Sequence, residues 1–212
     1  MARNKFLRKF YPAAPLLALV SIVTPGLASA QSQSPVVSAP AHELHLSVDP
    51  AQSSVHWTLP TALHTVHGTF NLRRGSLTVD PASGHISGEI VAAAASGESG
   101  NASRDSRMHS EILESSRYPD VSFRPDRLEG QPPGQGSSDF KLHGIFSLHG
   151  ADHEITVPVH AEIAAANWKG SAKFTIHYVQ WGLKDPSRFV LRVNPAVEIE
   201  LQLAGRLAAG PQ

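Results

Sequence analysis

The chain has 212 residues, of which 41% are hydrophobic and none is cysteine. This length fits about one domain with a buried core, and the lack of cysteine excludes both a disulfide-stapled fold and a lipoprotein anchored through an N-terminal cysteine. Basic and acidic residues both number 18, but four of the basic ones lie in the first nine positions, so the remainder has 14 basic against 18 acidic residues. A mildly acidic chain has no electrostatic attraction for nucleic acid, and no such partner is predicted.

Residues 1–30 have the three parts of a secretory signal peptide. A basic stretch, 1–9, precedes the mostly apolar 13–23, and Ala28-Ser29-Ala30 is a small-residue cleavage site. The apolar part is too short to span a bilayer, so we expect no stable membrane anchor, although an uncleaved segment is the alternative. The pattern predicts a periplasmic or secreted protein that begins at Gln31.

The rest of the chain is dominated by strand-like alternation. Residues 31–42 are polar and contain proline, as in a disordered tether. Beyond them, apolar and polar residues alternate in short segments separated by turn sequences rich in Asp, Pro and Gly, such as 80–84 and 130–139. Together the segments give about nine strands, at 44–48, 55–59, 66–70, 77–79, 86–95, 121–129, 140–148, 154–163, 168–179, 189–193 and 197–203, some of which are parts of one strand.

The alternation is interrupted once, between the two blocks of strands. There Met108 and Ile112 are four residues apart, as on one face of a helix. Ser103 is a suitable N-cap residue, and Pro119 should end the helix by about Arg117. We predict a single helix across Ser103–Arg117, placed to close the mouth of the sheet or barrel.

About nine short strands with one helix between them favour an all-β fold, an antiparallel sheet closed into a barrel over residues 43–207, with 208–212 as a tail. Closure removes the exposed edges that a secreted β protein must otherwise protect. A two-sheet sandwich has the same periodicity and stays open as the alternative.

The residue pattern predicts neither catalysis nor a metal site. Of the twelve histidines, His149 and His153 are four apart, but Gly150-Ala151-Asp152 between them predicts a turn rather than a helix. No cysteine or companion carboxylate completes a zinc site. The segment 96–100 lacks the Gly-x-Ser-x-Gly spacing of a nucleophile elbow. We therefore expect no enzyme, no catalytic residue and no cofactor.

The remaining signal is apolar. Alternation assigns seven aromatic residues to the interior: Trp57, Phe70, Phe123, Phe146, Phe174, Trp181 and Phe189. A barrel of about eight strands either fills with its own side chains or holds one small ligand. Periodicity does not distinguish the two.

Several motifs, in order, resemble the YceI-like family from about Leu46 to Leu207. These are Val48-Asp-Pro-Ala-x-Ser-x-Val-x-Trp57, Val66-His-Gly-Thr-Phe70 followed by Gly75, Asn101-x-x-Arg104-Asp105, Tyr118-Pro119, Leu148-His149-Gly150 before a strand, and Trp181-Gly182-Leu183. The chain departs from the common pattern at Trp57, where phenylalanine is usual, at Arg73, where an aromatic is usual, and at Arg107-Met108, where a His-Leu pair is usual. The resemblance implies a lipocalin-like barrel that holds a polyisoprenoid chain.

The expected function is thus an exported lipid-binding protein that carries, stores or sequesters a polyisoprenoid or isoprenoid quinone. Its apolar lipid would be the bound partner, and a homodimer stays open. The expected lining is Val55, Trp57, Phe70, Val79, Ile90, Met108, Ile112, Phe123, Leu148, Val157, Phe174, Ile176 and Leu191. The alternative is a packed, non-enzymatic structural or stress-related module that acts through its surface.

Overall fold

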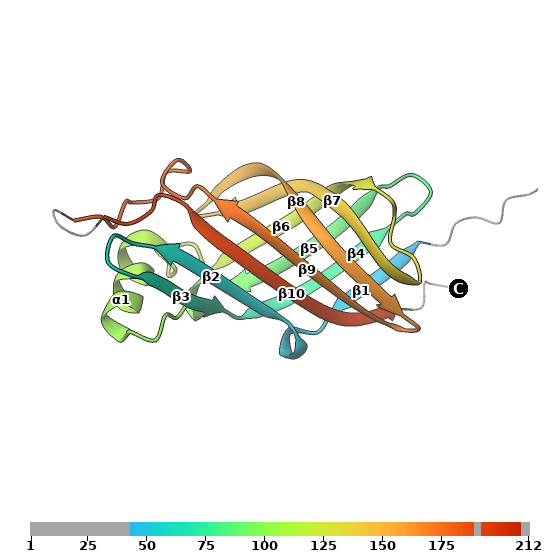
Figure 1. Ribbon diagram of the computed structural model, residues 1–212, viewed down its shortest axis with the longest axis horizontal. Coiled ribbons are helices and arrows are strands. Elements are labelled where there is room, and N and C mark those ends of the chain that lie inside the picture. The colour runs from blue at the N-terminus through green and yellow to red at the C-terminus, as the bar shows by residue number, and fades with distance from the viewer. Residues whose placement is uncertain (1–42, 189–191, 209–212) are drawn as a thin grey trace, which may run out of the picture. The chain divides into compact units, whose positions relative to one another are not determined.

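The computed structural model describes residues 43–188 and 192–208, and in them the chain forms an antiparallel β-barrel with one short helix at one end (Figure 1). The strands are β1 (Leu44–Val48), β2 (Ser54–Pro60), β3 (Thr65–Phe70), β4 (Leu72–Val79), β5 (Ile86–Ala93), β6 (Asp120–Gly130), β7 (Gly136–Leu148), β8 (Ala151–Ala164), β9 (Asn167–Ile176) and β10 (Val197–Ala208). The helical segments are η1 (Pro50–Gln52), η2 (Ala94–Ser96), α1 (Ala102–Arg107) and η3 (Met108–Ile112). The predicted signal peptide and tether, and residues 209–212 of the predicted tail, lie outside the described residues.

The sheet closes on itself because β1 pairs with both β4 and β10. β1 and β2 both pair with β10 and are separated only by η1, so they act as one long strand. β4 pairs with β1 and β3 pairs with β2, so β3 and β4 likewise act as one strand. The ten named strands therefore make an eight-stranded ring in which each strand pairs with its neighbours. This confirms the predicted antiparallel barrel and excludes the sandwich.

The register places the apolar side of each strand inward. On β10, Ile199 lies opposite Trp57 of β2 on one side and Phe174 of β9 on the other. Leu201 lies opposite Val55, two residues along the same strand. The glutamates between them point outward, because side chains of a strand alternate between its faces. Cross-strand pairs of this kind build the interior.

The helix is shorter than predicted and begins and ends differently. Its N-cap is Asn101 rather than Ser103, because the Asn101 side chain accepts a hydrogen bond from the backbone N–H of Arg104 at 3.0 Å. α1 passes into the π-helical turn η3, which ends at Ile112 and not at Arg117. Glu114 then takes a left-handed conformation, with φ 43°, and this reversal ends the helix before Pro119 can.

Several strand boundaries also differ from the prediction: β4 begins at Leu72 rather than 77, β7 begins at Gly136 rather than 140, and β10 ends at Ala208 rather than 203. β9 ends at Ile176 rather than at 179, because the following residues fold into hydrogen-bonded turns such as Leu183 N–H to Tyr178 O at 3.1 Å. Of the strand predicted at 189–193, residues 189–191 lie outside the described residues, and Val193 makes an isolated bridge with Thr61. The turn before β8 is His149-Gly150, both with positive φ, so Ala151 already belongs to the strand.

Within the described ranges, no helix combines the length and the hydropathy needed to cross a membrane.

Candidate ligand-binding cavity

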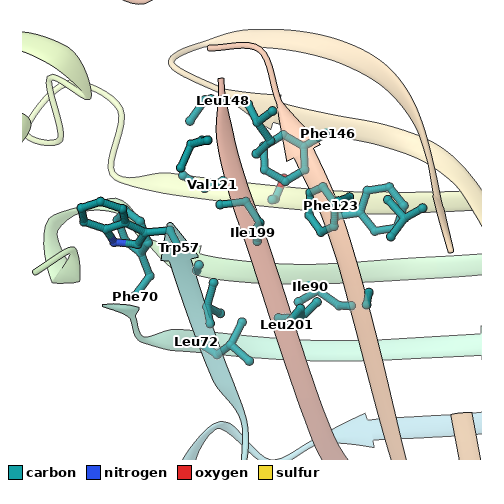
Figure 2. A pocket seen from close by; sticks show the side chains of 18 of the residues that line it. Trp57, Phe70, Leu72, Ile90, Val121, Phe123, Phe146, Leu148, Ile199 and Leu201 are labelled. Carbon is teal, nitrogen blue, oxygen red and sulfur yellow. The ribbon is translucent and has the colours of Figure 1, made fainter. Parts of the chain in front are cut away.

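The barrel encloses a cavity of about 560 Å³. This lies within the roughly 300–1,000 Å³ typical of small-molecule sites. Most of its lining is apolar and comes from the inward faces of the strands, and Figure 2 shows side chains from several strands around it. Such a space can enclose an apolar chain, but its strand lining offers little to bind a charged molecule.

The structure brings twelve of the thirteen predicted lining residues to this one cavity. These are Val55, Trp57, Phe70, Val79, Ile90, Met108, Ile112, Phe123, Leu148, Val157, Phe174 and Ile176. The thirteenth, Leu191, lies outside the described residues. Their contact with a ligand stays a prediction, but their common location follows from the alternation that selected them.

The prediction missed further lining residues with the same signal. They include Leu46, Leu59, Leu72, Leu77, Ile86, Leu142, Ile199, Leu201 and Leu203. Each occupies an inward position of a strand, so the period-two pattern marks it as clearly as the residues that were chosen. Phe146, expected in the interior, also lines the cavity.

Trp181 was expected inside the barrel and is not part of the cavity lining. It follows the end of β9, where alternation no longer applies, and its ring stacks on His153 with centroids 4.1 Å apart and planes 5° apart. The Trp181 ring also approaches Phe146, at 5.8 Å between ring centroids. Trp181 is thus half-buried against the apolar cluster around Phe146 without lining the cavity, and Phe189 lies outside the described residues.

One end of the cavity is covered by α1 and η3, residues 102–112, which we call the lid (Figure 1). Met108 and Ile112 of the lid line the cavity, as expected from their spacing. Gly97 fits between Met108 and the ring of Phe70, where a Cβ would overlap that ring. The lid therefore approaches the aromatic lining of β3 across Gly97.

The first turn of the lid is held by a polar cluster around Ser99. Arg104 donates to Ser99 twice, through Nε to Oγ at 2.7 Å and through a terminal nitrogen to the carbonyl at 2.9 Å. The Ser99 hydroxyl in turn donates to Asp105. Desolvation opposes ionisation of Asp105, but the hydrogen bonds from Ser99 and the nearby Arg104 charge outweigh it and lower its pKa. Asp105 is thus a fixed anion in the first turn.

Polar lining groups gather at the lid end of the cavity. Thr61 and His64 come from the β2–β3 hairpin, and Arg104 and Arg107 come from the lid. Tyr178, which also lines the cavity, donates its hydroxyl to Asn194 O at 2.8 Å. Burial, with a smaller contribution from the charge on Asp185, raises the pKa of Tyr178 to about 12, so its hydroxyl stays neutral. The cavity is apolar along its length and polar near one end.

No group of three or more metal-ligating side chains occurs within residues 43–188 and 192–208.

The sequence model of the YceI-like domain matches residues 46–204. The chain belongs to the YceI-like family. The resemblance inferred from the motifs is therefore confirmed across most of the barrel. A comparison with the curated proteins finds no match.

Solved structures share the fold of this YceI-like domain. BcnA from Burkholderia cenocepacia is 18% identical over 74% of this chain and 98% of its own, with a TM-score of 0.60. A polyisoprenoid binding domain from Saccharophagus degradans is 14% identical over 78% of this chain and 99% of its own, also at 0.60. The Campylobacter jejuni YCEI protein is 15% identical over 68% and 86%, at 0.56. At these identities the likeness establishes the fold.

Two of the YceI-like motifs meet at the base of the lid. His149, of Leu-His-Gly, donates a hydrogen bond from its Nε2 to Oε2 of Glu114, just after the lid, at 2.6 Å. The ring of His149 also packs against Tyr118, of Tyr-Pro, at 4.4 Å between centroids. Gly150 leaves room for Tyr118, since a Cβ would lie 2.5 Å from its ring. These motifs fasten the lid to the β7–β8 turn.

Proposed function

We propose that this YceI-like domain binds a long apolar lipid, a polyisoprenoid or an isoprenoid quinone, inside its barrel, and that it carries or sequesters that lipid outside the cytoplasm. The observation that carries the proposal is the barrel cavity lined by apolar side chains from most of the strands. The Saccharophagus degradans relative, described as a polyisoprenoid binding domain, supports the same class of ligand.

Burial of apolar surface would supply the binding energy. Each 100 Å² of apolar surface removed from water is worth about 2.5 kcal/mol. A prenyl chain enclosed by Val55, Phe123 and their neighbours would remove several times that area, which leaves a net gain after the cost of ordering the chain. Carriage of this kind needs no catalytic group, so the proposed protein is a carrier rather than an enzyme.

The cavity also favours this proposal over a packed barrel that acts through its surface. A packed interior would need side chains that fill the space between the strands. Here the inward residues of facing strands leave about 560 Å³ between them. Export fits the proposal, because a lipid cannot cross the aqueous space between membranes without cover.

Native purification followed by organic extraction and mass spectrometry tests the ligand. We expect a stoichiometric isoprenoid lipid from protein produced with its leader, and added quinone should bind to extracted protein. Recovery of no apolar ligand, with no binding of added quinone or prenyl alcohol, would rule the proposal out.

Export is tested by the N-terminus of the mature protein. Material from the periplasm or medium should begin at Gln31, after cleavage behind Ala30. A chain that keeps Met1 and fractionates with the membrane would contradict the proposed location without affecting the proposed ligand class.

A further inference from the structure

The indole N–H of Trp57 is a buried hydrogen-bond donor without a protein partner. Within the described residues, three other buried side-chain polar atoms share this property: Arg107 Nε, Asp120 Oδ1 and His153 Nε2. The arginine and the aspartate each belong to an ion pair, and the histidine ring stacks on Trp181. Trp57 has neither an ion-pair partner nor a stacked ring of this kind. It is 6% exposed and lines the cavity.

The position of the Trp57 ring is fixed by its neighbours. On β3 the residue opposite Trp57 is Gly68, and a Cβ there would overlap the indole ring. Phe70, diagonal to it in the register, lies beside it in Figure 2. The ring therefore lies across Gly68 and is held there by close packing. The carbonyl oxygen of Glu98 also lies beside Gly68, but it accepts from the Thr69 N–H at 2.9 Å and makes no hydrogen bond with the indole N–H.

Trp168 provides an internal comparison. It lines the same cavity and is 6% exposed, as Trp57 is. Its Nε1, however, donates to the carbonyl of Ser47 at 3.0 Å. The chain thus satisfies the indole N–H of Trp168 with its own backbone and leaves that of Trp57 without a partner among the described residues.

A buried donor without a partner costs about 1–3 kcal/mol, and a phenylalanine would fill most of the same space without that cost. A ligand oxygen that accepts a hydrogen bond from the indole N–H would remove this cost. The inward residues flanking Trp57 on its own strand, Val55 and Leu59, are apolar. Burying an anion beside them would be far more costly than burying a neutral oxygen that accepts one hydrogen bond.

We propose that Trp57 donates its indole N–H to a neutral acceptor oxygen of the bound isoprenoid, either a quinone carbonyl or a prenyl alcohol hydroxyl. Trp57 then makes the barrel selective for oxygenated isoprenoids over hydrocarbons of the same length. This inference rests on the proposed function. It also orients the ligand, because the polar end lies at the depth of Trp57 and the tail occupies the rest of the cavity.

The test compares Trp57→Phe with the matched control Trp168→Phe in the full mature chain. Three probes have a 20-carbon isoprenoid tail: menaquinone-4, geranylgeraniol and the hydrocarbon phytane. In the unaltered protein, binding of at least one oxygenated probe should move the Trp57 indole proton downfield in a ¹H–¹⁵N spectrum, and phytane should not. The signal is assigned by its absence in Trp57→Phe. A shift with only one oxygenated probe identifies the carbonyl or the hydroxyl as the acceptor.

Trp57→Phe should weaken binding of the oxygenated probe by about threefold to tenfold, and of phytane by less than about twofold, since one hydrogen bond is lost only in the first case. Trp168→Phe should leave the ratio of the two affinities unchanged. Equal losses for all three probes in Trp57→Phe, or an indole signal that moves equally with phytane, would overturn the inference and leave the proposed function intact. Failure of every probe to bind the unaltered protein would overturn both.

Discussion

The barrel wall and the lid are held in place by different interactions. The wall is a closed ladder, continuous for example along β7 and β8 from Gly136–Ile163 to Leu148–Ala151, with apolar residues buried on its inner face. The lid contains no fully buried residue. It is attached through polar contacts, among them Lys184 Nζ to Glu111 at 2.8 Å and His109 Nε2 with Gly97 O at 2.8 Å.

This contrast separates the two tasks of a lipid carrier. Enclosing the lipid depends on the burial of apolar surface, which supplies a large free energy without any titrating group. Admitting the lipid requires one element that opens at low cost, and such elements are those with few buried apolar contacts. We therefore expect the lid to open while the wall stays intact.

The largest effect is expected from a charge in the wall. Phe123 lines the cavity opposite Ile90 of β5 and Phe146 of β7. Phe123→Asp would place a carboxylate among them, lowering the free energy of unfolding by about 3–5 kcal/mol and abolishing lipid retention. Denaturant unfolding and lipid extraction measure both. The control is Lys141→Asp on the exposed face of β7, which should change neither. A folded Phe123→Asp protein with its full lipid content would show that the wall does not enclose the ligand.

The next effect concerns the attachment of the lid. His149→Ala removes the hydrogen bond to Glu114, which is worth about 1 kcal/mol, so lipid release should accelerate by about fivefold with little change in global stability. Stopped-flow transfer of a fluorescent prenyl lipid to vesicles gives the rate. His160→Ala is the matched control, since it removes a similar pair with Asp139, at 2.8 Å, on the outer wall. Equal release rates for the two variants would mean that the lid is not the gate.

The wall was predictable from the sequence to a large extent. The helical lid and its cavity-lining Met108 and Ile112 were also predicted, but the two ends of the lid were not. In the wall, side-chain direction depends only on odd or even position, so Val55, Trp57 and Phe70 could be placed inward before any contact was known. Trp181 packs against the interior cluster around Phe146 but does not line the cavity, because β9 ends at Ile176 and strand alternation does not apply beyond that residue.

The two ends of the lid depend on contacts that the periodicity of the sequence does not show. Asn101 and Ser103 are both good N-cap residues, and the hydrogen bond that selects Asn101 is visible only in three dimensions. At the other end, the left-handed Glu114 is hydrogen-bonded to His149, 35 residues later, and local periodicity does not show this contact. Periodicity also does not predict whether the barrel is hollow, because the space inside depends on the summed volume of all inward side chains.

A smaller effect is expected at alkaline pH, at the rim of the wall. The pKa of Tyr178 is raised by burial from 10.0 to about 12 in the folded protein. The neutral hydroxyl thus stabilises the fold fully below about pH 10, and this contribution is lost as pH rises toward 12. Tyr178→Phe should cost about 1 kcal/mol at pH 7, because Asn194 O loses its donor, but should unfold with less pH dependence between pH 10 and 11.5. Urea unfolding at several pH values measures the difference, and parallel curves for the two proteins would contradict it.

The smallest effect is expected at acid pH, in the lid. The hydrogen bond and charge of Lys184 hold the pKa of Glu111 below its ordinary value of 4.5. A carboxylate with a lowered folded pKa stabilises the fold above its ordinary pKa and loses that contribution as pH falls through the folded value. Lipid release should therefore be constant from pH 7 to about 5 and accelerate below about pH 4.5, by no more than about threefold because this pair is exposed.

Glu111→Gln sharpens this last comparison between lid and wall. The variant should release lipid slightly faster than the unaltered protein at pH 7 and show a weaker acceleration on acidification, since the Glu111–Lys184 ion pair has already been removed. Glu198→Gln removes a comparable pair with Lys173, at 2.8 Å, from the outer wall and should leave the release profile unchanged. If Glu111→Gln kept the full acid response, the Glu111–Lys184 pair would not be its source.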